Sequence, residues 1–132
     1  MFDSNLALAA THSGEIEFSI EEKSENQVAS RMPISEGMLN PFGTIHAGAL
    51  IWMADVTATV LALQNAKVDS NGRGFPLAIN ITTNLIGNQR EGEVTAEAKF
   101  VRKGKRVNVI RTVILGNNQT LLAEVTTTHV PA

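Results

Sequence analysis

The sequence contains no cysteine among its 132 residues, which excludes disulfide bonds, thiolate catalysis and cysteine-ligated zinc and is consistent with a reducing compartment. It also lacks an excess of positive charge, because 11 Lys and Arg stand against 13 Asp and Glu and neither end carries a basic tail. Nucleic-acid binding, which depends on cations that neutralise phosphates, is therefore disfavoured. Hydrophobic residues make up 43% of the chain and charged residues only 18%, which favours a folded core over disorder.

An export signal is also missing from the amino terminus. The only apolar run there, Leu6 to Ala10, is five residues long and follows Asp3 with no preceding Lys or Arg, so it is too short for a secretory signal. We expect a turn or short helix packed on a single domain of residues 1–132. A cytoplasmic location is the working assumption.

Apolar and polar residues alternate with a period of two in six segments, which predicts six strands. We expect these strands at residues 15–21, 27–34, 75–85, 94–100, 106–115 and 121–130. The second half of 106–115 is apolar on both faces, as is typical of a central strand. The breaks at 103–105 and 116–118 are short enough to close antiparallel hairpins.

Residues 45–63 read IHAGALIWMADVTATVLAL and contain no proline and one charge, Asp55. The length nearly suits a membrane span, but an aspartate at the centre of a span costs about 2.5–3.5 kcal/mol and no positive cluster flanks the segment. We therefore expect a long helix that is apolar nearly all round because other elements cover most of its sides. Thr44 or His46 is the expected cap.

The order of elements, β-β-α-β-β-β-β, predicts an α+β fold in which one antiparallel six-stranded sheet curls around one long central helix. Such a sheet has two open edges. The strongly alternating strands carry more apolar residues than one helix can cover, which indicates that a second copy of the chain pairs with the sheet.

Asp55 is the first candidate for a functional residue. An ionised carboxylate without partners is costly to bury, so an acid in a covered helix indicates a use, although a structural aspartate that caps a neighbouring loop is the alternative. Thr59 lies four residues later on the same helical face and can reach Asp55 or a shared water. Alternatively, Thr59 fills the core and bonds back to its own helix.

His46 is not expected to pair with Asp55 within one chain. Nine residues of helix turn the two side chains to opposite faces and separate them by about 13.5 Å along the axis. His12 and His129 lie near the termini and offer no metal-ligand spacing with His46, so we expect no metal site.

The start of the helix is a candidate anion site. Unpaired N–H groups at a helix start can bind an anion or a developing oxyanion, and Ala47 and Gly48 would let a substrate carbonyl come close. Small residues serve tight helix packing equally well. A second candidate is the basic group at the predicted 103–105 hairpin, which either binds phosphates or is a solvated turn: Arg102, Lys103, Lys105 and Arg106.

The stretch NPFGTIHAGALIWMADVTATVLA resembles the signature of hotdog-fold acyl-CoA thioesterases of the phenylacetate-pathway and 4-hydroxybenzoyl-CoA thioesterase type. In that signature a His-Gly-Gly opens the central helix and an acid follows nine positions after the His, which correspond here to His46 and Asp55. The segments INITTNLI and VRKGKRVNVIRTVI fit the family's later strands, so the resemblance covers residues 15–130.

The resemblance implies roles for individual residues. Asp55 would be the catalytic carboxylate, as nucleophile or as general base on water, and the N–H of Ala47 would polarise the thioester carbonyl. Asn40 matches a position that holds the attacking water or the substrate in some members, and Thr59 matches a threonine that assists the carboxylate. The family builds its site across a dimer, with the acid from one subunit and the helix start from the other. The chain departs from the pattern at Ala47, where the family has glycine, and at Pro76, where some members place a catalytic serine.

We therefore predict a homo-oligomeric acyl-CoA thioesterase, a dimer or a dimer of dimers, that needs no cofactor and binds neither nucleic acid nor membranes. The basic group would bind the CoA phosphates, and the acyl group would lie near Leu39, Phe42, Trp52 and Met53. Two alternatives stay open. One is a hotdog hydratase or dehydratase with a His–acid pair formed across subunits, and the other is a non-catalytic module that binds or senses acyl-CoA.

Overall fold

A computed structural model describes residues 14–132, so the expected turn or short helix near the amino terminus lies outside the described residues. The elements follow the predicted order: β1 (Ser19–Lys23), β2 (Gln27–Pro33), α2 (Ala47–Leu63), β3 (Pro76–Leu85), β4 (Glu93–Arg102), β5 (Asn108–Leu115) and β6 (Leu121–Pro131). Two short 3₁₀ turns, Glu36–Met38 and Asn117–Gln119, precede α2 and β6.

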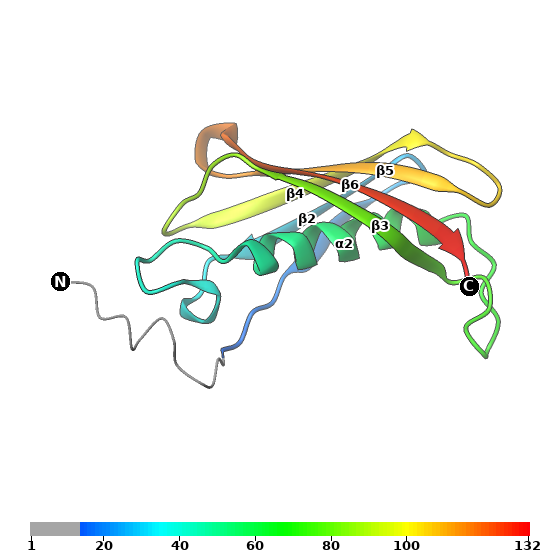
Figure 1. The fold of residues 1–132 in the computed structure, drawn as a ribbon, viewed down its shortest axis with the longest axis horizontal. Helices are drawn as coiled ribbons and strands as arrows, with labels where there is room; N and C mark the ends of the chain where they lie inside the picture. The colour runs from blue at the N-terminus through cyan, green and yellow to red at the C-terminus, as the bar shows by residue number, and fades with distance from the viewer. Residues whose placement is uncertain (1–13) are drawn as a thin grey trace.

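The strands form one antiparallel sheet in the order β1-β2-β4-β5-β6-β3. Figure 1 shows α2 lying along one face of this curved sheet, with β3 at one edge. β5 lies between β4 and β6, which confirms the prediction of a central strand from its apolar pattern. The predicted α+β architecture is therefore confirmed.

The core lies between the sheet and one face of α2. Residues of α2 that are buried recur every three to four positions: Ala49, Leu50, Met53, Ala54, Thr57, Ala58, Leu61 and Ala62. Gly48 and Trp52 are exposed, and Asp55 and Thr59 are half-buried. The prediction that other elements cover α2 on most sides is wrong for the single chain, because one sheet reaches only one face of the helix.

The first strand is shorter and later than predicted. Ile16 and Phe18 do pack against the core, as their alternation indicates, but pairing begins only at Ser19, opposite Arg31. Two residues beyond Arg31, β2 reaches Pro33, which has no N–H to donate to a neighbouring strand. The alternation therefore predicted burial correctly and the extent of the strand incorrectly.

The helix begins at Ala47, two residues later than predicted, because the residues before it are extended. Ile45 forms an isolated antiparallel bridge with Leu39, and His46 is the N-cap with φ −63° and ψ 138°. Of the two expected caps, His46 occupies the N-cap position, although its side chain makes no capping hydrogen bond. Thr44 lies two residues before it, and its hydroxyl accepts a hydrogen bond from Asn40. Among residues 14–132, no helix is long and apolar enough to cross a membrane.

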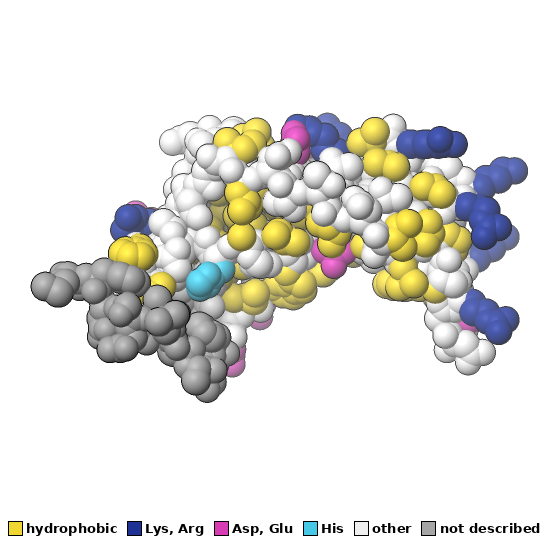
Figure 2. Space-filling view, in the orientation of Figure 1, with side chains coloured by type: hydrophobic (Ala, Val, Ile, Leu, Met, Phe, Trp, Pro, Cys, Tyr) yellow, Lys and Arg dark blue, Asp and Glu magenta, His cyan; other side chains and the backbone are white. Residues whose placement is uncertain are grey.

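β3 forms one edge of the sheet and exposes large apolar side chains. Leu77, Ile79, Ile81 and Leu85 are 43–62% exposed. Figure 2 shows hydrophobic side chains gathered on the face of the molecule that carries β3 and α2. This surface is where the sequence leads us to expect a second copy of the chain.

Candidate active site

Asp55 lies on the face of α2 that the sheet does not cover. Its neighbours on that face, by the rotation of an α-helix, are Gly48, Trp52 and Thr59. Asp55 and Thr59 are each half-buried, one helical turn apart. The predicted full burial of the acid is wrong for the single chain, because the residues next to it, not Asp55 itself, face the sheet.

The first amides of α2 are unpaired within the described chain. Ala49 is the first residue to donate its N–H, to the carbonyl of His46 at 3.1 Å, and residues 14–132 supply no acceptor for the N–H groups of Ala47 and Gly48. A Cβ added to Gly48 would meet no atom within 4 Å. Packing among the described residues therefore does not require this glycine, and they leave the backbone here open to a ligand or a second subunit.

Asn40 organises the loop that leads to α2. Its Oδ1 accepts the N–H of Phe42 at 2.9 Å and of Thr44 at 3.2 Å, and its Nδ2 donates to the Thr44 hydroxyl at 2.7 Å. A carboxamide has two amide hydrogens, so one hydrogen of Asn40 remains beyond this network. Asn40 thus shapes the loop, and the predicted contact with water or substrate would use the second hydrogen.

Asn88, in the loop between β3 and β4, also contacts the start of α2. Its Oδ1 accepts the N–H of Ile45 at 2.8 Å, and its Nδ2 donates to the carbonyl of the same residue at 3.0 Å. Sequence reasoning missed Asn88 because it lies 43 positions from Ile45 in a segment that reads only as a turn. Nothing in the local pattern could have found it.

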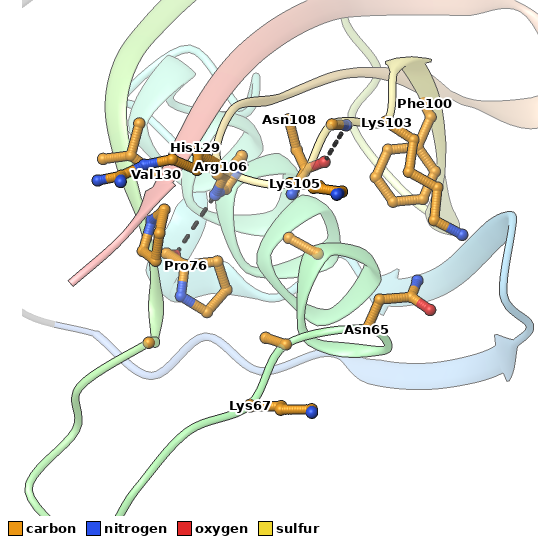
Figure 3. A pocket seen from close by; sticks show the side chains of 15 residues that line it. Asn65, Lys67, Pro76, Phe100, Lys103, Lys105, Arg106, Asn108, His129 and Val130 are labelled. Carbon is orange, nitrogen blue, oxygen red and sulfur yellow. Dashed lines mark hydrogen bonds between the residues drawn. The ribbon is translucent and has the colours of Figure 1, made fainter.

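A cavity of about 310 Å³ lies at the opposite end of α2 (Figure 3). Its walls come from the end of α2, the β4–β5 hairpin and the strand ends at Pro76 and His129. Of the four basic residues predicted to bind phosphates, Lys103, Lys105 and Arg106 line this cavity. Lys67, which the sequence analysis did not select, joins them from the loop after α2.

The geometry of the β4–β5 hairpin depends on Gly104. A Cβ on Gly104 would lie 2.5 Å from the carbonyl oxygen of Val107, so this tight turn excludes larger residues. The Gly104 N–H donates to Oδ1 of Asn108 at 2.9 Å, which explains why β5 begins at Asn108 and not at residue 106 as predicted. Figure 2 shows the Lys and Arg side chains gathered at this end of the molecule.

His129 is fully buried in the wall of the cavity. Its Nε2 lies 2.9 Å from the Thr127 hydroxyl, and its Nδ1 lies 3.5 Å from the carbonyl of Pro76, as Figure 3 shows. Burial lowers the pKa of the imidazole, while the Pro76 carbonyl and the negative charge of Asp55 act in the opposite direction. Pro76, at the position where some of the resembling thioesterases have a catalytic serine, is buried, and its carbonyl oxygen makes this contact with His129.

The structure therefore arranges the predicted residues along one helix but does not bring them all together. Ala62, in the cavity wall, lies seven residues after Asp55, about 10.5 Å along the axis, and is itself buried against the sheet. The Ala47 amide lies about 12 Å from Asp55 in the other direction, and His46, which precedes it, is exposed. Within one chain the acid cannot act on a group held by the helix start.

The predicted acyl-binding residues Met53 and Trp52 lie on different faces of α2. Met53 is fully buried in the core, so its predicted place in an acyl pocket is wrong: it lies on the helix face that packs against the sheet. Trp52 is 39% exposed on the side of Asp55, and its ring meets that of Phe18 edge-to-face at 4.7 Å. Trp52 is thus the apolar side chain of α2 best placed to meet a ligand.

Known structures share this architecture. A thioesterase enzyme from Staphylococcus aureus, solved as a variant, is 24% identical and superposes with a TM-score of 0.79 over 86% of this chain and 92% of that chain. A Streptococcus mutans protein bound to acetyl-CoA is 14% identical, with a TM-score of 0.79 over 94% of each chain. A hypothetical thioesterase from Streptococcus pneumoniae, solved with coenzyme A, is 16% identical, with a TM-score of 0.77 over 88% of this chain and 86% of that chain. These similarities confirm the predicted hotdog fold.

Sequence comparisons give the family. A Haemophilus influenzae protein named "Putative esterase" is 26% identical over 85 residues, which are 64% of this chain. The chain spans 59% of the length of that relative. The family described as Domain of unknown function (DUF4442) matches residues 1–129, and the chain belongs to this family.

Proposed function

We propose that this protein hydrolyses an acyl-CoA thioester to a free carboxylic acid and CoA. The observation that carries the proposal is the half-buried Asp55 on the uncovered face of α2, with a cavity lined by cations at the end of the same helix. Fold relatives that are thioesterases, or that hold CoA or acetyl-CoA, support this assignment.

The chemistry needs only groups carried by α2, with Asp55 and the oxyanion donors taken from two copies of the helix. As a general base, the carboxylate of Asp55 takes a proton from water, and the water oxygen attacks the thioester carbonyl. As a nucleophile, the carboxylate attacks the carbonyl directly and forms an anhydride, which water then hydrolyses. The carbonyl oxygen becomes negatively charged, and the N–H groups of Ala47 and Gly48 stabilise this charge. The intermediate collapses, the C–S bond breaks, and the thiolate of CoA leaves and takes up a proton. Thr59, one turn from Asp55, orients the carboxylate or the water.

The site is proposed to form across a homodimer, because the oxyanion donors lie about 12 Å from Asp55 in one chain. β3 is a ten-residue edge strand with an exposed apolar face, which is suited to antiparallel pairing with β3 of a second copy. In this arrangement Asp55 of one subunit meets the helix start of the other, as in the resembling thioesterases.

The cavity at the end of α2 is the proposed site for the phosphates of CoA. Lys67, Lys103, Lys105 and Arg106 would neutralise them. The pantetheine arm would then run along α2 from Ala62 towards Asp55. The acyl group would lie beyond Asp55, towards Trp52. The resemblance to the phenylacetate-pathway and 4-hydroxybenzoyl-CoA types makes aromatic acyl-CoAs the first substrates to test.

The test is release of free CoA from aromatic and straight-chain acyl-CoAs by the wild type and by Asp55→Asn. We expect kcat to fall about 10²–10⁴-fold in the variant, the range that general acid–base catalysis supplies, with the affinity for CoA retained. Asp69→Asn removes the same charge from the loop after α2, where Asp69 bonds to Asn71 and Arg73, and is expected to keep full turnover.

Other outcomes point to the alternatives. Binding of acyl-CoA without turnover by the wild type would contradict hydrolysis and favour a binding or sensing module. Consumption of enoyl-CoA without CoA release would favour a hydratase, in which His46 of one subunit meets Asp55 of the other.

A further inference from the structure

The residue just before α2 is held by a side chain from a distant loop. Ile45 is 3% exposed and is part of the core cluster of Met38, Ala49 and Leu50. Both hydrogen-bonding groups of its backbone are engaged by one carboxamide, that of Asn88, at 2.8 and 3.0 Å. A carboxamide that bonds both the N–H and the C=O of one residue fixes the orientation of that residue's backbone.

The geometry of the bridge between Leu39 and Ile45 explains why a side chain is needed there. The hydrogen bonds of this bridge come from flanking residues, Asn40 to Thr44 at 2.8 Å and His46 to Met38 at 2.8 Å. Ile45 therefore belongs to a non-hydrogen-bonded pair, whose own N–H and C=O point away from the partner. Asn88 occupies the place that a third strand would take.

Asn88 is itself fixed to the sheet. The N–H groups of Ile86 and Gly87 both donate to the carbonyl of Leu122 in β6, at 2.8 and 2.9 Å. The N–H of Gln89 donates to Oδ1 of Asn88 at 2.8 Å, which sets the direction of the side chain. Hydrogen bonds of Ile86 and Gly87 thus anchor to β6 the chain just before Asn88, and the Asn88 side chain in turn holds Ile45, two residues before Ala47.

We propose that Asn88 is a positioning residue for the site: its carboxamide holds Ile45 so that the N–H of Ala47 points at the reacting carbonyl. This inference rests on the proposed thioesterase function. Oxyanion donors act only when fixed before the reaction, and a displacement of about 1 Å can cost about 10²-fold in rate. The CoA phosphates are bound at the other end of α2, so Asn88 is expected to affect the chemical step and not affinity.

Asn88→Ala is the test variant, and Gln89→Ala is its matched control. Gln89 is the neighbouring carboxamide in the same loop, and its side chain bonds to the backbone of Glu91, Glu93 and Asn117 but not to Ile45. For Asn88→Ala we expect kcat to fall at least about tenfold, with KM and the Kd for free CoA within about twofold. For Gln89→Ala we expect a lower Tm with kcat within about twofold.

Hydrogen exchange of the Ile45 amide gives a readout that is independent of turnover. We expect faster exchange in Asn88→Ala and wild-type exchange in Gln89→Ala. If Asn88→Ala does not fold, Asn88→Asp replaces it, because the carboxylate keeps both accepted hydrogen bonds and loses only the donor to the Ile45 carbonyl.

Three results would overturn the inference: unchanged kcat in the Asn88 variant, an equal loss of kcat in Gln89→Ala, or unchanged exchange of the Ile45 amide in Asn88→Ala. In Asn88→Asp that amide keeps its acceptor, so for this variant kcat decides. If the wild type hydrolyses no thioester, the proposed function fails. The exchange comparison then decides alone whether Asn88 holds Ile45.

Discussion

The two ends of α2 differ in how they are built. The start carries no acidic residue in its first turn and is fixed by hydrogen bonds from two carboxamides, Asn40 and Asn88. The end opens onto a cavity lined by four basic residues with long side chains: Lys67, Lys103, Lys105 and Arg106. Oxyanion stabilisation requires donors fixed in advance, whereas point charges bind phosphates with looser geometry. In the proposed site, the start of α2 therefore serves the chemical step, and the end of α2 serves binding of the CoA phosphates.

Changes at the start of α2 should alter kcat, and changes at its end should alter KM, because in the proposed site the two ends contact different parts of the same substrate. Asp55 lies between them, and in the proposed dimer a second subunit supplies the helix start that acts with it.

The largest effect in this comparison is expected from breaking the proposed dimer, which would separate the helix start of one chain from Asp55 of the other. Ile79→Lys together with Ile81→Lys places two charges on the apolar edge of β3. We expect a monomer that retains the fold and loses about 10²–10³-fold in kcat, the cost of removing an oxyanion donor. Sedimentation and CoA release measure the two parts.

Val101→Lys is the control for the β3 variant. Val101 and Ile79 are both 62% exposed, but Val101 lies on β4, away from the edges of the sheet. Dimers and turnover should both persist. A fully active monomer of the β3 variant would contradict a site shared between subunits.

The next effect is expected at Gly48, where stability and activity should move in opposite directions. The methyl group of Gly48→Ala would meet no atom of residues 14–132, so the substitution should stabilise the helix by about 0.5–1 kcal/mol. The added methyl group occupies the space proposed for the thioester carbonyl, so kcat should fall about 10- to 10²-fold. Thermal unfolding and CoA release check the two directions.

Ala47→Gly is the reciprocal variant. It restores the glycine that the resembling thioesterases have and keeps the N–H, so kcat should stay close to the wild-type value while Tm falls. Full activity of Gly48→Ala would show that no substrate group approaches this part of the backbone.

The smallest kinetic effect is expected at the charged end of α2. Lys103→Glu with Lys105→Glu should raise KM for acyl-CoA about tenfold, since two lost or reversed ion pairs of up to about 1 kcal/mol each approach the 1.4 kcal/mol of a tenfold change. kcat should stay within about twofold, and KM should lose part of its dependence on salt.

Lys23→Glu with Lys99→Glu makes the same change of charge away from the cavity. It should leave KM close to the wild-type value. An equal rise in KM for both double variants would indicate net charge and not a phosphate site.

The sequence predicted the sheet better than the surroundings of the helix. Alternation of apolar and polar residues located β2 to β6 and the packing of Ile16 and Phe18. It did not report burial in β3, where Leu77, Ile79 and Ile81 are 43–62% exposed in the single chain. It could not report where backbone pairing stops, which depends on Pro33 in the neighbouring strand. It also could not say whether the sheet or a second subunit covers α2, because a residue buried in either way is apolar.

The residues of the candidate site likewise differ in whether the local sequence reveals them. Asp55, the helix start and the basic hairpin were found because each carries a local signal: one charge in an apolar run, a run of small residues, and four cations around a glycine. Lys67 and Asn88 carry no such signal. Their roles depend on contacts with residues distant in the sequence, and a single sequence does not display such contacts.

The last prediction concerns stability at the charged end and is expected to be smaller than the kinetic effects. Burial lowers the pKa of His129 from its usual 6.5. As pH falls through about 6.5 the unfolded chain takes up a proton at this position while the folded chain does not, so the folded state loses stability until pH reaches the lowered pKa. His129→Gln removes this titration, so its Tm should fall less than that of the wild type between pH 7.5 and the acid side of this window. Parallel curves for wild type and His129→Gln would mean that the imidazole is protonated as easily in the folded protein as in the unfolded chain, and that the cavity wall tolerates a fifth positive charge.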